Sequence, residues 1–159
     1  MLRAVPGGRQ PTCEKRHASM VENPGPTTSV LLVDGNVEHR QYWANQLKTC
    51  SAEYVFLEAR DGQSGLALYK SQPVDCVVVE LDLPDLSGFS FLVKIVERPQ
   101  HPEIAVIILT HLVHSSFDRL AKENGAQCCL TKSHTSCEEL HRAIQRGIAK
   151  VGPRKGRLA

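Results

Sequence analysis

The sequence predicts an α/β fold in which a doubly wound, five-stranded parallel sheet carries helices on both faces. Short apolar runs alternate five times along the chain with segments of helical spacing. Most of these runs are continuously apolar rather than alternating, which indicates strands that are buried on both faces, as in a parallel sheet. Repeated β–α units of this kind form an open sheet whose functional groups gather at the carboxyl ends of the strands.

Each apolar run is short enough to be one strand of this sheet. The five expected strands are Ser29–Val33, Tyr54–Glu58, Cys76–Val79, Ala105–Leu109 and Gln127–Leu130. No apolar run approaches the roughly 18 residues that a membrane-spanning helix needs.

The segments between the strands show the spacing of amphipathic helices. The first helix is expected to bury one face formed by His39, Tyr42, Trp43, Gln46 and Leu47, with Tyr42 and Trp43 as core residues. The third and fifth helices are indicated by Phe89, Leu92, Val93 and Val96, and by Leu140, Ala143, Ile144 and Ile148. Two shorter helices are expected, one after the turn at Asp61-Gly62 and one that ends at Asn124-Gly125.

Composition divides the chain into one domain and two tails. Residues 1–28 contain several prolines and glycines without periodicity, so we expect a disordered leader, with Met1 or Met20 as the start. Residues 29–151 form the expected domain, and residues 152–159 a short basic tail. No secretory signal is evident at the N-terminus, which predicts a cytoplasmic protein.

The bulk charge and cysteine content exclude several classes of protein. The net charge of +2 and the pI of about 8.2 are too weak to indicate a partner that is a nucleic acid or an anionic membrane. Six cysteines in a chain of this length do not suggest a disulfide framework, and several lie within apolar runs as small hydrophobic residues.

Polar residues follow four of the five strands. Asp34 and Gly35 come after the first strand, Glu80 after the third, Thr110 after the fourth and Lys132 after the fifth. Because these strand ends meet at one edge of a parallel sheet, carboxylates, a hydroxyl and a lysine should converge there. The loop after Thr110 also contains His111 and His114. They either tune the charge of this edge near neutral pH or are simply solvent-exposed, and we favour the second interpretation.

These motifs together resemble the receiver domain of bacterial response regulators over about residues 29–151. The matching segments are Val30–Gly35, Glu80–Gly88, Thr110, Gly125-Ala126 and Lys132. The resemblance implies a flavodoxin-like (βα)5 fold and a two-component signalling role. In this family an Asp after the third strand accepts a phosphoryl group, an acidic pair holds Mg²⁺, and a Thr and an aromatic residue report phosphorylation.

The chain departs from the family pattern at each of these functions. Glu80 occupies the phospho-acceptor position, and its extra methylene moves the carboxylate by roughly 1.5 Å. Gly35 replaces the second acidic residue, and Cys129 occupies the aromatic switch position. We therefore expect no cofactor and at most a weak Mg²⁺ site formed by Asp34, Glu80 and Asp82.

Two physical states of the pocket remain open from the sequence. Glu80 either reaches Lys132 and Thr110 and imitates a phosphorylated aspartate, or belongs to a vestigial pocket in which Lys132 neutralises Asp34 and Glu80. In either state, we expect the protein not to signal by ordinary aspartyl phosphorylation. The expected protein is a non-enzymatic, stand-alone receiver-like module that contacts a histidine kinase, another regulator or its own copy. Its contact face should comprise the fourth helix, fifth strand and fifth helix.

Two other functions are weighed against this one. A phosphorylatable regulator could accept phosphate at Glu80, Asp82 or Asp85. A haloacid-dehalogenase-type phosphatase would need a second Asp two residues after Asp34, where this chain has Asn36.

Overall fold

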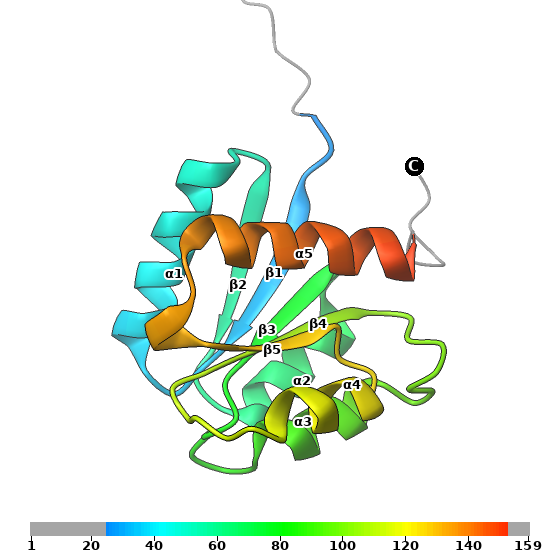
Figure 1. Ribbon diagram of the computed structural model, residues 1–159. Helices are drawn as coiled ribbons and strands as arrows, with labels where there is room; N and C mark the ends of the chain where they lie inside the picture. The colour runs from blue at the N-terminus through cyan, green and yellow to red at the C-terminus, as the bar shows by residue number, and fades with distance from the viewer. Residues whose placement is uncertain (1–24, 153–159) are drawn as a thin grey trace, which may run out of the picture.

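The computed structural model describes residues 25–152, in which a five-stranded parallel sheet lies between two layers of helices (Figure 1). The strand order is β2-β1-β3-β4-β5, which confirms the predicted doubly wound α/β class. The strands are β1 (Thr28–Val33), β2 (Tyr54–Ala59), β3 (Cys76–Val79), β4 (Ala105–Thr110) and β5 (Cys128–Thr131). Each differs from its expected range by no more than one residue at either end.

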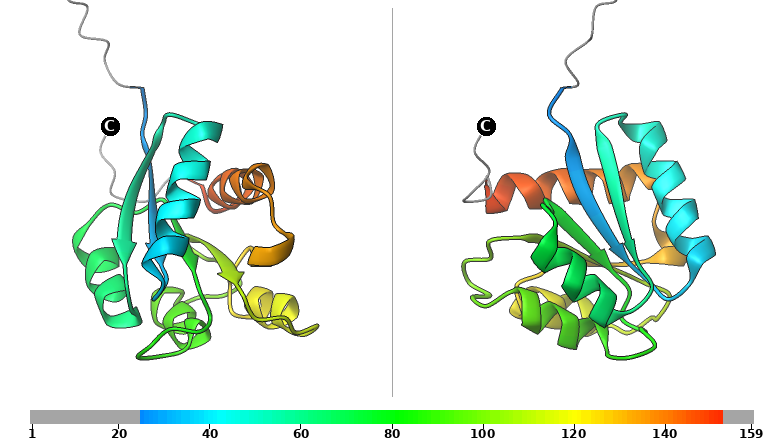
Figure 2. Two further views of the ribbon diagram at one scale, coloured as in Figure 1. Left: turned by 90° about the vertical axis from the view of Figure 1, so that its left-hand side faces the viewer. Right: turned by 180° about the vertical axis from the view of Figure 1, so that it is seen from behind.

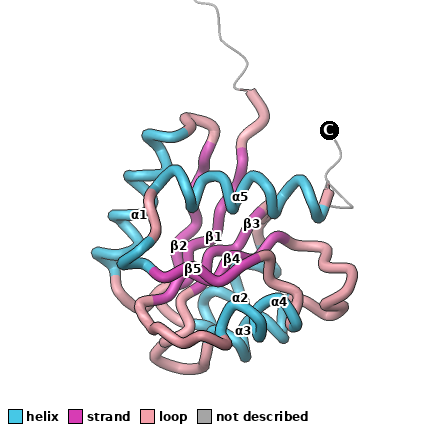
Figure 3. Tube along the Cα trace, viewed as in Figure 1, coloured by secondary structure: helices cyan, strands magenta, loops and turns pink. Residues whose placement is uncertain are grey.

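The helices divide between the two faces of the sheet. They are α1 (Val37–Cys50), α2 (Gly62–Ser71), α3 (Gly88–Ile95), α4 (Phe117–Glu123) and α5 (Cys137–Val151), with a 3₁₀ turn, η1, at Lys132–His134. Helices α1 and α5 cover one face, and α2, α3 and α4 cover the other (Figure 2). Figure 3 shows the magenta strands enclosed between these two cyan layers.

Alternate residues of each central strand enter separate hydrophobic clusters. In β1, Val30 and Leu32 pack toward α1 and α5, whereas Leu31 and Val33 pack toward α2 and α3. Strands β3 and β4 alternate in the same way, and all of their apolar side chains are buried. The continuous apolar runs of β1, β3 and β4 are therefore explained by burial on both faces, as predicted, whereas the edge strands β2 and β5 are only partly buried.

Two of the expected helix faces are wrong at one residue each. Tyr42 is 56% exposed and Val93 is 57% exposed, although both were expected to face the sheet. In α1 the buried stripe is Trp43, Ala44 and Leu47, and the Tyr42 ring instead packs edge-on against Trp43 from outside. In α3 the buried residues include Phe91 and Ile95. In each helix the buried stripe is shifted by about one position from the expected one. Ala44 in α1, and Phe91 and Ile95 in α3, are buried although the apolar spacing did not place them on the expected faces.

The helix boundaries follow from local capping. Asn36 and Ser136 accept hydrogen bonds from main-chain N–H groups in the first turns of α1 and α5. Asn124 and Gly125 end α4, as predicted, and Gly125 has a positive φ of 92° that suits glycine. Strand β1 begins at Thr28, while the expected leader before residue 25 and the tail after residue 152 lie outside the described residues.

Gly88 is the point at which α3 approaches the backbone of the loop that begins at Glu80. A Cβ atom at this position would lie 2.8 Å from the Leu81 Cα and closer still to the Glu80 carbonyl oxygen. We therefore expect Gly88→Ala to lower the free energy of unfolding by about 1–3 kcal/mol through overpacking. Urea denaturation measures this loss. Gly25→Ala is the control, because nothing lies within 4 Å of its added Cβ atom; equal stability of the two variants would contradict the prediction.

Candidate functional pocket

The topology places the candidate pocket where the chain reverses its winding direction. Strands β1 and β3 are neighbours in the sheet, yet their following connections run to opposite faces, which opens a crevice at their carboxyl ends. Asp34 and Glu80 follow these two strands, Thr110 ends β4, and Lys132 follows β5. The structure brings together all four of these predicted residues through direct contacts.

The Glu80 carboxylate is buried and accepts hydrogen bonds on both oxygens. Its Oε1 accepts from the main-chain N–H groups of Leu81 at 2.7 Å and Asp82 at 3.2 Å, and from the Thr110 hydroxyl. Its Oε2 accepts from the His111 main-chain N–H at 3.1 Å and lies 2.8 Å from the Lys132 Nζ. Only 3% of the Glu80 side chain is exposed. Glu80 therefore accepts the hydrogen bonds of the donor groups that line the pocket.

Lys132 directs its ammonium group to three acceptors. The Nζ lies 2.8 Å from Glu80 Oε2, 2.5 Å from Asp34 Oδ2 and 2.9 Å from His39 Nδ1. An ammonium has three N–H donors and no acceptor, so His39 must accept through Nδ1 and carry its own proton on Nε2 when neutral. These contacts use the full donor capacity of Lys132.

The surroundings of Glu80 hold its carboxyl group in the ionised form. Burial raises its pKa, but the hydrogen bonds from Lys132 and Thr110 and the positive charge of Lys132 outweigh this effect. The pKa falls to about 2, from an ordinary value of 4.5. The pocket therefore contains a fixed negative charge throughout the physiological pH range.

This lowered pKa predicts a specific loss of stability in acid. A group whose pKa is lower in the folded state contributes stability above its unfolded pKa and loses it as pH falls through the folded value. Glu80 should therefore contribute about 3 kcal/mol at pH 7, and this contribution should decline from about pH 5 to pH 2. Urea denaturation at pH 7 and pH 3 should show a larger decline for the parent than for Glu80→Gln. Parallel declines would contradict the prediction.

His111 lies at the mouth of the pocket, where its side chain is partly exposed and also contacts Glu80. Half of its side chain is accessible, as expected for a loop histidine, but its Nδ1 lies 3.1 Å from Glu80 Oε2. Its Nε2 lies 3.6 Å from the carboxylate of Asp82. His114 instead contacts Ser116 and packs near Phe117, away from Glu80. Sequence reasoning did not predict the contact between His111 and Glu80.

Asp82 contacts the pocket through its backbone rather than its carboxylate. Its main-chain N–H donates to Glu80, while 64% of its side chain is exposed. Asp34 Oδ1 accepts from the Asn36 N–H at 2.9 Å, and its Oδ2 is bound by Lys132. Among residues 25–152, no three His, Cys, Asp or Glu side chains are arranged to hold a metal ion. Lys132 binds Asp34 and Glu80, two of the three acids expected to form a weak Mg²⁺ site, whereas the Asp82 carboxylate is exposed.

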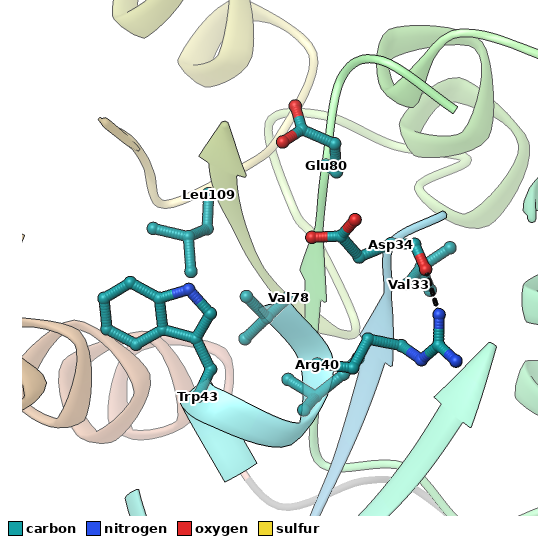
Figure 4. Close-up of a pocket in the computed structure, with 8 residues that line it drawn as sticks. Val33, Asp34, Arg40, Trp43, Val78, Glu80 and Leu109 are labelled. Atoms are coloured by element: carbon teal, nitrogen blue, oxygen red, sulfur yellow. Dashed lines mark hydrogen bonds between the residues drawn. The ribbon is translucent and has the colours of Figure 1, made fainter. Parts of the chain in front are cut away.

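Below the carboxylates, the pocket floor is closed. A cavity of about 10 Å³ lies under Asp34 and Glu80 and is bordered by Trp43, Val78 and Leu109 (Figure 4). This volume suffices for about one water molecule. The Arg40 guanidinium donates to the Asp34 main-chain oxygen at 2.5 Å and so fixes the turn from β1 into α1. The floor of the pocket is thus formed by apolar side chains of α1, β3 and β4.

The position of the expected aromatic switch is occupied by a small, half-buried thiol. Cys129 packs against the cluster on the α2–α4 side, and burial raises the pKa of its thiol to about 11. Its main-chain N–H donates to the Asp118 carboxylate at 3.1 Å, which joins β5 to α4. A side chain of this size cannot mark two states by rotating between buried and exposed positions.

His39 and Arg40 are functional neighbours that the sequence did not indicate. Both lie in the first turns of α1, directly after Asp34, and contact Lys132 and the Asp34 backbone. The apolar spacing of α1 placed His39 on the core face instead. Only three residues separate β1 from α1, so the first turn of α1 must lie near the end of β1. This short connection was the signal in the sequence that could have placed His39 and Arg40 near the pocket.

Comparison with known proteins agrees with this geometry. The family model of the response regulator receiver domain matches residues 30–145. The chain belongs to the response regulator receiver domain family. In this receiver, Glu80 directly follows β3, and Thr110 ends β4.

Relatives of this receiver include short and much longer proteins. It is 28% identical over 116 residues to a probable chemotaxis protein CheY of Rhizobium etli, covering 73% of this chain and 88% of that protein. It is 30% identical over 89 residues to a gliding motility regulatory protein of Myxococcus xanthus, covering 56% of this chain but 12% of that protein.

Solved receiver structures share the fold. A response regulator receiver domain from Clostridium thermocellum superimposes with a TM-score of 0.66 at 28% identity, covering 77% of this chain and 95% of that one.

Within residues 25–152, no helix has the length and apolar character required to cross a bilayer.

Proposed function

We propose that this receiver signals through protein contacts without aspartyl phosphorylation, and that ionised Glu80 keeps the pocket in an occupied state. The observation that carries this proposal is the contact of Glu80 with both Thr110 and Lys132. In the family these two groups bind phosphoryl oxygens. Here they bind the two oxygens of one carboxylate, which lies farther from the backbone than an aspartate would place it.

The hydrogen bonds of the pocket favour an imitation of phosphate over a simple vestige. Neutralisation of two carboxylates needs only Lys132, but the buried Thr110 hydroxyl also turns toward Glu80. A carboxylate carries one charge, compared with nearly two for a phosphoryl group, so the imitation is partial in charge. Because the donors are engaged, a phosphodonor would have to displace Glu80 from them before reacting.

The proposed contact surface is formed by α4, β5 and α5. A groove of about 490 Å³ lies between β5 and α5, and its lining includes Leu130, Arg142, Arg146 and Lys150. Three basic residues outnumber the one acidic residue of the lining, Glu139, so the groove suits a protein partner with acidic side chains. We propose a histidine kinase, another regulator or a second copy as the partner, in a bacterial cytoplasmic two-component pathway, rather than a nucleic acid or a membrane.

The first test is intact-mass spectrometry after incubation with acetyl phosphate and Mg²⁺. The parent chain should gain no phosphoryl group, because Glu80 fills the position that the phosphoryl group would take. The same incubation of a phosphorylatable receiver provides the positive control. A parent chain that gains one phosphoryl mass would contradict the proposal.

Such a gain would favour the alternative function of a phosphorylatable regulator. Fragmentation would then locate the acceptor among the three acids of this loop. Asp85 accepts hydrogen bonds from the N–H groups of Gly62 and Gln63 at 2.8 and 2.9 Å, whereas Asp82 is exposed. The phosphoryl group would therefore be expected on Asp82 or Glu80 rather than on Asp85.

Protein contact is tested separately by sedimentation equilibrium and by pull-down with histidine kinases and regulators. The parent should bind a partner or itself, and Glu80→Ala should bind more weakly because Thr110 and Lys132 lose their acceptor. Lys94→Ala, on the exposed surface of α3, serves as the matched control. Absence of any self-association or partner would defeat the proposed role.

A further inference from the structure

Two cysteine side chains meet between α1 and α5, away from the Glu80 pocket. Cys50 is the last residue of α1 and Cys137 is the first residue of α5, which begins beside α1 (Figure 1). Their Sγ atoms are 2.7 Å apart although the residues are separated by 87 positions in sequence. This separation is shorter than ordinary packing of unbonded sulfur atoms and approaches the S–S bond length of about 2.05 Å.

The other cysteines of the described chain are not arranged in this way. Cys76 is fully buried within β3. Cys128 and Cys129 are neighbours on β5 and enter opposite hydrophobic clusters, so their thiols point apart. Both Cys50 and Cys137 are partly exposed, so a small oxidant can reach the pair.

We propose that Cys50 and Cys137 form a reversible redox site in which a low-molecular-weight disulfide converts the two thiols into one intramolecular disulfide. This site is independent of the function proposed for Glu80. It would join the end of α1 covalently to the start of α5.

The reaction is two successive thiol–disulfide exchanges. The Cys50 thiol loses its proton and attacks one sulfur of the small disulfide, which releases one small thiol and leaves a mixed disulfide on Cys50. Cys137 then loses its proton and attacks the Cys50 Sγ, which releases the second small thiol. Two protein thiols and one small disulfide thus yield one protein disulfide and two small thiols.

The environment of Cys137 supports this order of steps. Burial and the contact with Cys50 raise the pKa of Cys137 to about 12, and its Sγ lies 3.0 Å from the Gln46 main-chain oxygen. The Cys137 thiol is therefore difficult to ionise while Cys50 is reduced, which assigns the first attack to Cys50. Once Cys50 carries the mixed disulfide, the short distance between the sulfur atoms favours the second exchange.

The disulfide would connect the proposed contact face to the helix beside the pocket. Helix α5 forms part of the face with α4 and β5, and α1 carries His39, which contacts Lys132. In a reducing compartment such a bond forms only under oxidising conditions, as redox-sensing disulfides do. Oxidation would then restrict movement of α5 relative to α1.

The test uses the full chain equilibrated with glutathione buffers of increasing oxidised fraction, followed by blocking of free thiols with N-ethylmaleimide. Non-reducing peptide mass spectrometry should identify a cross-linked peptide containing Cys50 and Cys137, which dithiothreitol removes. The oxidised chain should melt about 5–15 °C above the reduced chain, as expected for a cross-link closing a long loop.

Variants make the assignment specific. Cys50→Ser and Cys137→Ser should each abolish the cross-link, whereas Cys128→Ser should retain it. Circular dichroism of the reduced variants establishes that they are folded. A stable glutathione adduct on Cys50 without closure, a cross-link between another pair, or no oxidation of either residue would each overturn the proposal.

Discussion

Replacing Lys132 by methionine is expected to lower the free energy of unfolding by about 3–5 kcal/mol at pH 7. The substitution keeps much of the side-chain volume but leaves Asp34 and Glu80 without the cation that lies 2.5 and 2.8 Å from them. Glu80 is almost fully buried, so its charge cannot be compensated by water. Urea denaturation of the parent and the variant measures the loss.

The controls separate loss of this cation from a general loss of charge. Lys94→Met, at an exposed position in α3, should change stability by no more than about 0.5 kcal/mol. Adding Glu80→Gln to Lys132→Met should recover part of the loss, because the buried charge disappears as well. A loss below about 1 kcal/mol for Lys132→Met would show that Lys132 does not stabilise the buried carboxylates.

Combining Glu80→Asp with Gly35→Asp is expected to produce a receiver that accepts phosphate in the presence of Mg²⁺. The shorter Asp at position 80 withdraws from Thr110 and Lys132 and frees them for phosphoryl oxygens. The second acid restores the pair of carboxylates that a hard divalent cation requires. A Cβ atom at Gly35 would lie 3.3 Å from the Pro84 Cδ and 3.6 Å from the Arg60 carbonyl oxygen, so a small movement of Pro84 accommodates it.

Phosphorylation of the double variant by acetyl phosphate should be about 10- to 100-fold faster than that of Glu80→Asp alone. Intact-mass spectrometry over time, with and without Mg²⁺, measures both rates. Glu80→Asp with Gly35→Asn is the control, because Asn has nearly the same size as Asp but no charge. Equal rates for the Asp and Asn variants would show that the acid at position 35 is not what limits phosphorylation.

The fold was largely predictable because its signals are local. Continuous apolar runs located all five strands, and residues such as Asn124 and Gly125 located helix ends. The exposed faces of α1 and α3 were less predictable. Tyr42 and Val93 are apolar and lie next to the buried stripe, and only contact with the sheet decides which of two adjacent stripes is buried.

The candidate pocket was predictable in its members but not in its contacts. Strand ends identified Asp34, Glu80, Thr110 and Lys132, because parallel strands must end at one edge. The division of Lys132 among three acceptors depends on distances across separate loops, and no spacing in the sequence indicates it. The same holds for the approach of Cys50 and Cys137, which are 87 positions apart in the sequence.

The loop from Glu80 to Gly88 gives the pocket one rigid wall. The Gly88 N–H donates to the Leu81 carbonyl oxygen at 2.8 Å, and Asp82 and Ser87 form a β-bridge. Asp85 fastens the same loop to the start of α2. The opposite wall, residues 111–115, is exposed along most of its length and includes Val113. We therefore expect any rearrangement around Glu80 to move residues 111–115, which lead into α4 and so into the proposed contact face.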